Sequence, residues 1–245
     1  MSKAVLILGA TSAIARGTAA AFATRGHPLY LASRDDAELQ RIAADLRIRY
    51  RVDVQCGLFD AEDCASHAAF LRAVTEKMDG LGGVVLAFGY LGDQLAARDF
   101  SIGAQVIARN FTGAASILSH CANYFEPLKR GFIIGISSVA GDRGRQSNYV
   151  YGAAKGALSL YLQGLRNRLY ASGVRVITIK PGFVDTAMTF GLPGLFLVAS
   201  PQRVGEHIAQ TLDHAFDVVY LPWFWRWIML IIKLIPEPIF KRLKL

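Results

Sequence analysis

Short apolar runs alternate with longer segments of helical periodicity along most of this chain. The apolar runs are rich in Val, Ile and Leu and predict strands near residues 3–9, 28–33, 52–58, 83–89, 131–138, 174–180 and 217–221. The segments between them predict helices near residues 13–25, 36–48, 62–78, 99–126, 149–171 and 202–215. Apolar strands that alternate with helices indicate a parallel sheet covered on both faces. We therefore expect one α/β domain over residues 1–222, with a doubly wound sheet of about seven strands.

The segment 223–245 follows a different pattern, in which tryptophans and cations interrupt an apolar helix. Trp223, Trp225 and Trp227 are the three tryptophans of the chain, and Trp prefers the interface between membrane and water. A helix over residues 223–235 would measure about 20 Å, less than the ~30 Å core of a bilayer. We expect an amphipathic helix that lies on a membrane surface. A helix packed on the domain and a contact with a second subunit remain alternatives.

The net charge of +8 narrows the choice of partners and of compartment. Much of the positive charge lies near the C-terminus, in Arg226, Lys233, Lys241, Arg242 and Lys244 against the single Glu237. No nucleic-acid module is recognisable, so this asymmetry favours an anionic membrane surface and no nucleic-acid partner. Three cysteines without metal-ligand or disulfide spacing predict free thiols, a reducing compartment and no metal site. Because the first strand starts directly after Lys3, no signal peptide is expected, and we predict a cytoplasmic protein bound peripherally to the membrane.

The first predicted strand runs into a loop of small residues that opens a helix. A strand, a tight turn and a helix in this order present backbone N–H groups and a helix N-terminus to a phosphate. This arrangement predicts a Rossmann-type domain, with a dinucleotide held by Gly9, Thr11, Ser12, Ala13 and Ile14. Because alanines stand at positions 13 and 15, where glycines are usual, an ordinary tight turn remains an alternative.

The residues after the second and third strands bear on the choice of cofactor. Ser33 and Arg34 offer a hydroxyl and a guanidinium where an acidic residue would bind the ribose 2′-hydroxyl of NADH. We therefore expect NADPH or NADP as cofactor, with NADH disfavoured. Asp35 and Asp36 fit the N-cap of the next helix. Asp60 is placed to reach the adenine, or equally to cap a helix that begins at Ala61.

Three side chains of reactive type lie close together in the second half of the chain. Tyr151 and Lys155 share one face of a predicted helix, and Ser138 ends a predicted buried strand. A nearby ammonium lowers the pKa of a phenol, which is ordinarily near ~10. A hydroxyl donor together with an acidified phenol suits the polarisation and protonation of a carbonyl group.

These segments resemble the short-chain dehydrogenase/reductase family over nearly the whole chain. The resemblance implies that Tyr151 gives a proton to the substrate oxygen, that Ser138 holds this oxygen and that Lys155 lowers the Tyr pKa and binds the nicotinamide ribose. It also implies a catalytic Asn110, which would order a water next to Lys155. Further cofactor contacts are implied at Ala87, Phe88, Gly89, Pro181, Gly182, Val184 and Thr186. Phe88 departs from the usual Asn-Ala-Gly. Family members are often dimers or tetramers, so we expect a homodimer or a homotetramer.

The residues after Thr186 describe the expected substrate. Segment 187–200 is unusually apolar and stands where the family has its substrate lid, although a segment that merely packs on the domain is an alternative. Segment 223–245 and residues 87–94 resemble a group within the family, the decaprenylphosphoryl-2-keto-ribose reductases. This resemblance implies a lipid-linked keto-sugar as substrate. A sterol or 3-ketoacyl lipid is the alternative, and a non-catalytic NADP-binding protein that docks on membranes is a third possibility.

Overall fold

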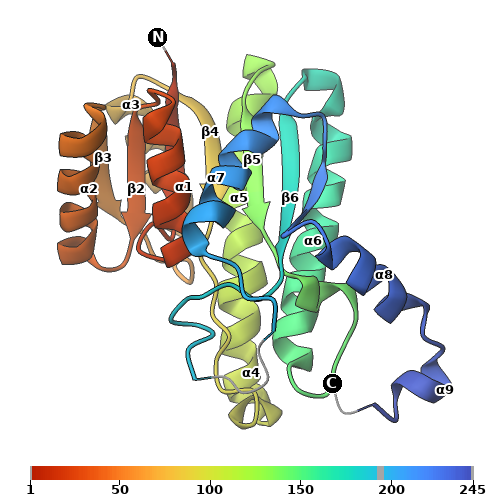
Figure 1. Ribbon diagram of the computed structural model, residues 1–245. Coiled ribbons are helices and arrows are strands. Elements are labelled where there is room, and N and C mark those ends of the chain that lie inside the picture. The colour runs from red at the N-terminus through yellow and green to blue at the C-terminus, as the bar shows by residue number, and fades with distance from the viewer. Residues whose placement is uncertain (1, 192–195, 244–245) are drawn as a thin grey trace.

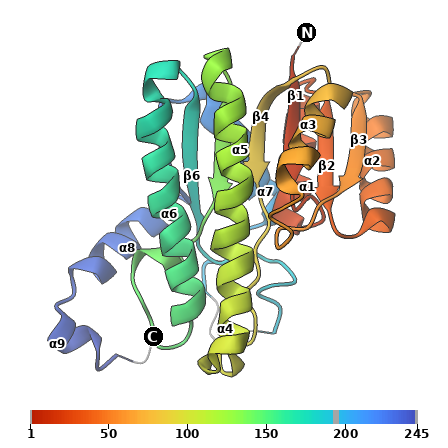
Figure 2. The same cartoon turned by 180° about the vertical axis from the view of Figure 1, so that it is seen from behind.

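Seven parallel strands form one sheet with helices on both faces, as the computed structural model of the protein shows for residues 2–191 and 196–243 (Figures 1 and 2). The strands are β1 (Ala4–Leu8), β2 (Leu29–Ser33), β3 (Val54–Leu58), β4 (Leu81–Leu86), β5 (Phe132–Ile136), β6 (Arg175–Pro181) and β7 (Val218–Leu221). Their order is β3-β2-β1-β4-β5-β6-β7, and every neighbouring pair is parallel. The direction of winding changes between β1 and β4, where open α/β sheets bind ligands. The Rossmann-like fold expected from the sequence is confirmed.

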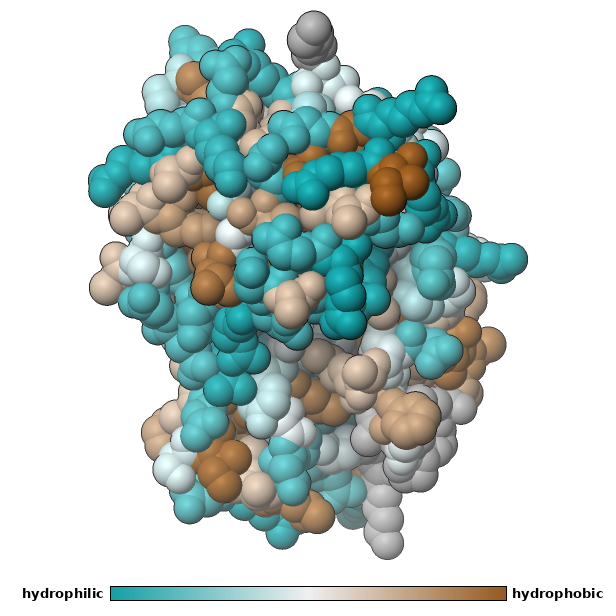
Figure 3. Space-filling view, turned by 90° about the vertical axis from the view of Figure 1, so that its left-hand side faces the viewer, coloured by the Kyte–Doolittle hydropathy of each residue, from teal (hydrophilic) through white to brown (hydrophobic). Residues whose placement is uncertain are grey.

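The helices divide into two layers because side chains alternate between the two faces of each strand. The helices are α1 (Ala13–Thr24), α2 (Asp36–Tyr50), α3 (His67–Lys77), α4 (Phe100–Ile107), α5 (Gly113–Leu128), α6 (Tyr149–Leu169), α7 (Pro201–Gln210), α8 (Trp225–Leu234) and α9 (Glu237–Phe240). Val5 and Ile7 of β1 pack with α1, α2 and α7, whereas Leu6 and Leu8 pack with α3, α5 and α6. The outer side of α2 is exposed, and Figure 3 shows mainly hydrophilic residues on this side of the molecule.

Two helices differ from the sequence-based prediction. The helix expected at 62–78 begins at His67, because the Asp60 carboxylate accepts from the backbone N–H of Glu62 at 3.0 Å and closes a turn instead of capping a helix. The helix expected at 99–126 is interrupted by a π-helical turn at Ala108–Thr112. Asn110 lies in this turn and donates to the carbonyl of Val106 at 2.8 Å, so a side chain replaces part of the helical ladder.

The C-terminal segment packs on the domain with one face and exposes the other. Trp225 and Met229 of α8 are buried against Val139, whereas Trp227 is 56% exposed and Ile231 is 66% exposed. Within the described part of the chain, no helix combines the length and the hydropathy needed to cross a bilayer. The alternative of a packed helix therefore holds for one face of α8, and the outer face remains available for a partner or a membrane.

Candidate active site

A cavity of about 1740 Å³ lies at the carboxyl edge of the sheet. Its walls come from the loop between β1 and α1, the residues after β4 and β5, helix α6 and the segment after β6, and the cavity continues along α1, α2 and α7. The predicted site residues on these walls are Thr11, Ser12, Ala13, Ile14, Ala87, Phe88, Gly89, Ser138, Tyr151, Lys155, Pro181, Gly182, Val184 and Thr186. Segments that are far apart in the sequence thus meet in one place, as expected for a parallel sheet.

The loop between β1 and α1 forms a cradle suited to a phosphate. Gly9 has a φ of +79°, and a Cβ atom there would lie only 2.6 Å from the backbone N of Phe88, so no other residue fits without strain. The Ser12 hydroxyl caps α1 by accepting from the N–H of Ala15 at 3.2 Å. The N-terminus of α1 is therefore fixed with its N–H groups toward the cavity, as a dinucleotide phosphate requires.

The residues expected around the adenosine ribose lie beyond the lining of this cavity. Ser33 is buried, and its hydroxyl accepts from the N–H of Asp35 at 3.2 Å. Asp35 caps α2, as predicted. Arg34 is exposed and forms no ion pair with any residue that the structure describes. Asp60 is also exposed and serves the turn before α3.

Ser138, Tyr151 and Lys155 line the cavity together. The Nζ of Lys155 donates to the backbone carbonyl of Ile136 at 3.1 Å and lies 5.9 Å from the centroid of the Tyr151 ring. The Ser138 hydroxyl lies near the Tyr151 phenol and lowers its pKa. The neighbouring Ser137 points the other way, where its hydroxyl donates to the Lys155 carbonyl at 2.8 Å. The backbone after β5 thus turns Ser137 toward α6 and leaves Ser138, in an extended conformation, as the hydroxyl that faces the cavity.

Burial controls the protonation of this cluster. It raises the pKa of Tyr151 to about 12, and the nearby Ser138 hydroxyl offsets this rise only in part. Burial also lowers the pKa of Lys155 to about 8. The expectation that Lys155 brings the Tyr pKa below its ordinary value is wrong for this structure, because desolvation of the phenolate dominates. The phenol therefore stays protonated at neutral pH, as a proton donor must be before the transfer.

Asn110 supports the site without lining the cavity. It is 1% exposed, and its amide accepts from the N–H of Tyr90 at 3.1 Å and donates to the Tyr90 carbonyl at 2.6 Å. A Cβ atom on Gly89 would lie 3.2 Å from both Asn110 Oδ1 and Lys155 Nζ. The π-helical turn therefore places Asn110 next to the backbone that separates it from Lys155. The expected water between the two side chains stays a prediction.

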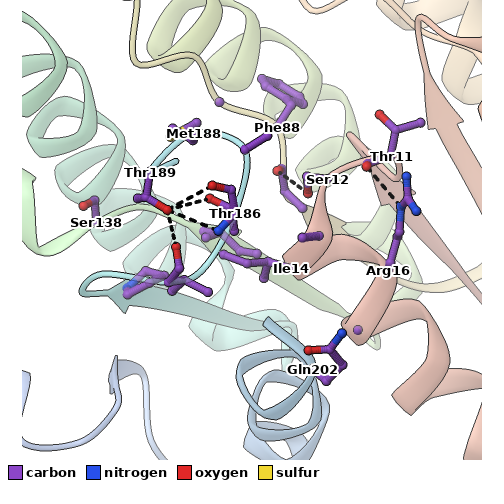
Figure 4. A pocket seen from close by; sticks show the side chains of 18 of the residues that line it. Thr11, Ser12, Ile14, Arg16, Phe88, Ser138, Thr186, Met188, Thr189 and Gln202 are labelled. Carbon is purple, nitrogen blue, oxygen red and sulfur yellow. Dashed lines mark hydrogen bonds between the residues drawn. The ribbon is translucent and has the colours of Figure 1, made fainter. Parts of the chain in front are cut away.

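The segment after β6 forms the wall between the cofactor loop and the reactive hydroxyl. Figure 4 shows Thr186 and Thr189 between Ser138 on one side and Ile14 on the other. Thr189 Oγ1 donates to the carbonyls of Val184 and Thr186, at 2.6 and 3.0 Å. This hydroxyl fixes the turn that carries Thr186, a role that the sequence interpretation missed. Of the expected lid 187–200, residues 192–195 lie outside the described residues.

Three further polar residues at this site were not predicted. Arg145 and Asn148 line the cavity. Gln94 contacts the backbone N of Tyr151, with Oε1 at 3.5 Å. The sequence could have pointed to these residues only through their position between the recognised motifs, because a polar residue in a loop has no periodic pattern.

A doubly wound sheet with a phosphate cradle and a Ser-Tyr-Lys cluster defines a nicotinamide-dependent oxidoreductase. The model of the short chain dehydrogenase family matches residues 3–192, and the chain belongs to this family. It is 35% identical over 240 residues to an uncharacterized oxidoreductase of Mycobacterium tuberculosis, and the matched region covers 98% of this chain and 96% of the relative.

Solved structures agree with this assignment. The fold is similar to a short-chain dehydrogenase from Sphingobium yanoikuyae in complex with NADPH, with a TM-score of 0.77, 26% identity and coverage of 93% of this chain and 92% of that one. An alcohol dehydrogenase from Thermococcus sibiricus complexed with 5-hydroxy-NADP has a TM-score of 0.80 at 22% identity, with coverage of 90% and 96%. The protein is thus an NAD(P)-dependent oxidoreductase that acts on CH–OH groups or the corresponding carbonyls.

Proposed function

We propose that this protein is an NADPH-dependent carbonyl reductase that acts on a lipid-linked keto-sugar at a membrane surface. The observation that carries the carbonyl chemistry is the grouping of Ser138, Tyr151 and Lys155 in one cavity, where burial keeps the Tyr151 phenol protonated. The nicotinamide supplies a hydride when bound. Ser138 holds the substrate oxygen by its hydroxyl, and Tyr151 gives it the proton. Because the pKa of Lys155 is lowered to about 8, its ammonium can return a proton to the Tyr151 phenolate that the transfer leaves.

The preference for NADPH rests on the residues after β2. Arg34 is exposed and without an anionic partner among the described residues, and Ser33 precedes it with a hydroxyl. Such a pair suits the 2′-phosphate. The Sphingobium dehydrogenase was solved with NADPH and the Thermococcus enzyme with an NADP derivative, which supports the same choice.

Replacing Arg34 with Asp tests this preference. We expect the Kd for NADPH to rise by about ten- to hundred-fold, because a charge-assisted bond is replaced by repulsion, while the Kd for NADH changes little. Fluorescence titration of both cofactors measures the two constants. Equal weakening of both would contradict a role of Arg34 at the 2′-phosphate.

The lipid part of the proposal rests on the apolar surface near the cavity. Phe190 is 88% exposed in the segment after β6, and α8 exposes Trp227 and Ile231. These side chains would meet a lipid chain or a bilayer surface. The similarity of segments 87–94 and 223–245 to decaprenylphosphoryl-2-keto-ribose reductases supports a keto-pentose on a polyprenyl phosphate. A sterol or 3-ketoacyl lipid is the alternative substrate.

The first experiment is the oxidation of NADPH with a polyprenyl-phosphoryl 2-keto-pentose, followed by absorbance. We expect turnover by the parent protein and a loss of at least about 100-fold in kcat for Tyr151→Phe, which removes the proton donor but keeps the ring. NADPH binding should persist in this variant. Turnover that survives in Tyr151→Phe would contradict the mechanism. If Tyr151→Phe shows no turnover but still performs the function of the protein in cells, the protein would be a non-catalytic docking protein.

A further inference from the structure

The loop before α6 carries two arginines that have different environments. Arg143 donates to backbone carbonyls at the end of α8 and pairs with Glu237 at 3.0 Å. Arg145 forms no ion pair with any described residue, and its Nε is buried without a hydrogen-bond partner. The fold therefore uses Arg143 as a structural clamp and leaves Arg145 without a counter-charge.

Arg145 lines the same cavity as Ser138 and Tyr151. Its guanidinium remains protonated at neutral pH, and its burial lowers its pKa because the cation is poorly solvated. A partly buried cation without an anionic partner is unfavourable. An anion bound in the cavity would offset this cost.

Asn148 adds a second unpaired polar group to the same wall. It occupies the N-cap position of α6 but makes no capping hydrogen bond. Its Oδ1 is buried without a partner, and the residue lines the cavity. An amide oxygen accepts hydrogen bonds, so it fits a hydroxyl group of a ligand. A cation and an acceptor that line one cavity suit an oxygen-rich anionic molecule.

The cofactor phosphates do not account for Arg145. Their expected cradle is the N-terminus of α1, with Thr11 and Ser12. Figure 4 shows Thr11 and Ser138 at opposite sides of the cavity, with Thr186 between them. Arg145 belongs to the loop that follows Ser138, so it serves the side of the cavity on which a substrate carbonyl would lie.

We propose that Arg145 binds an anionic oxygen of the substrate, such as a phosphate ester, next to the carbonyl held by Ser138 and Tyr151. Asn148 accepts a hydrogen bond from a substrate hydroxyl. This inference rests on the proposed reductase function and narrows it, because a neutral sterol ketone offers nothing to Arg145. The substrate is then an amphiphile, with its anionic and hydroxylated part at Arg145 and Asn148 and its apolar part at the segment after β6.

Binding of farnesyl phosphate and of the uncharged farnesol tests the anion site directly. Calorimetry would be performed with the full chain saturated with NADP⁺, for the parent, Arg145→Gln and Arg145→Lys. We expect Arg145→Gln to weaken farnesyl phosphate binding by about ten- to hundred-fold and to leave farnesol binding unchanged. Arg145→Lys, which keeps the charge but loses the forked geometry, should show a smaller loss.

Two outcomes would overturn the proposal. The first is a parent protein that binds farnesyl phosphate no more tightly than farnesol, and the second is an equal effect of Arg145→Gln on both ligands. Thermal unfolding of both variants checks the fold, and Arg145→Lys carries the test alone if Arg145→Gln does not fold.

The keto-sugar assay separates this site from the proposed function. Turnover by the parent with an unchanged KM in Arg145→Gln would reject the anion site alone. Farnesyl phosphate binding that depends on Arg145, without turnover of the keto-sugar, would reject the keto-sugar alone and keep the anion site.

Discussion

Lys155 shows how one buried side chain links the chemistry of the site to the stability of the fold. Its ammonium is withdrawn from water, and the pKa falls from 10.5 to about 8. Between these values the unfolded chain binds a proton that the folded chain does not, so the free energy of unfolding rises with pH in this window. The buried Lys155 ammonium lowers the free energy of unfolding, and this effect is fully present below about pH 8 and disappears as the pH approaches 10.5.

The substitution Lys155→Met tests this linkage. The free energy of unfolding of the parent, relative to the variant, should increase by about 3 kcal/mol from pH ~7 to pH ~10.5, because only the parent loses a buried charge. Urea denaturation at a series of pH values measures the difference. A difference that stays constant with pH would show that Lys155 is not desolvated as described. The variant should also lose reductase activity.

At the scale of elements, α8 packs the C-terminal segment against the segment after β6, which lines the cavity. A Cβ atom on Gly182 would lie 2.0 Å from the indole of Trp225, so the residue after Pro181 has to be glycine for the helix to dock. Arg143 holds the other end of α8 to the loop after Ser138. The inner face of α8 is therefore part of the domain, and the outer face is the part available for a membrane.

The double substitution Trp227→Gln and Ile231→Gln tests the outer face. Both side chains are exposed, so the melting temperature should change little, whereas binding to vesicles of anionic lipid should fall by at least about ten-fold. Sedimentation with vesicles measures this binding. Met229→Ala is the matched control on the inner face and should cost about 2–5 kcal/mol of stability while vesicle binding of the folded protein persists. Retention of the double variant on vesicles would contradict the surface role.

At the scale of the whole molecule, α5 and α6 form the exposed side of one helical layer (Figure 2). Leu160 of α6 is 70% exposed, and an exposed apolar side chain on a paired helix layer suits a contact with a second copy. We propose a homodimer or homotetramer that uses this layer.

Leu160→Glu is expected to shift the protein to the mass of a single 26.7 kDa chain in light scattering. The charge would be buried in the contact without a partner. Ile48→Glu on α2, at the other side of the sheet, is the control, because Ile48 is 79% exposed and outside the proposed contact. A mass that is the same for the parent and Leu160→Glu would contradict this contact.

The seven strands and most helices could be predicted because buried parallel strands leave uninterrupted apolar runs in the sequence. The grouping of Tyr151 with Lys155 on α6 could be predicted for a similar reason, since helical spacing is a local property, whereas Ser138 lies two residues beyond the end of β5. The start of α3 and the π-helical turn at Asn110 could not be predicted, because side-chain contacts with Glu62 and with Val106 and Tyr90 decide them.

The sequence by itself determined the fold class, and it predicted the phosphate cradle and the reacting groups, because each depends on residue type and short spacing. Only the tertiary structure decided how these groups ionise and which polar groups stay unpaired. Arg143 and Arg145 are two residues apart and chemically identical, yet one is clamped to α8 and the other faces the cavity. The pKa of Tyr151 rises instead of falling for the same reason. Desolvation and pairing arise from contacts between segments that are distant along the chain.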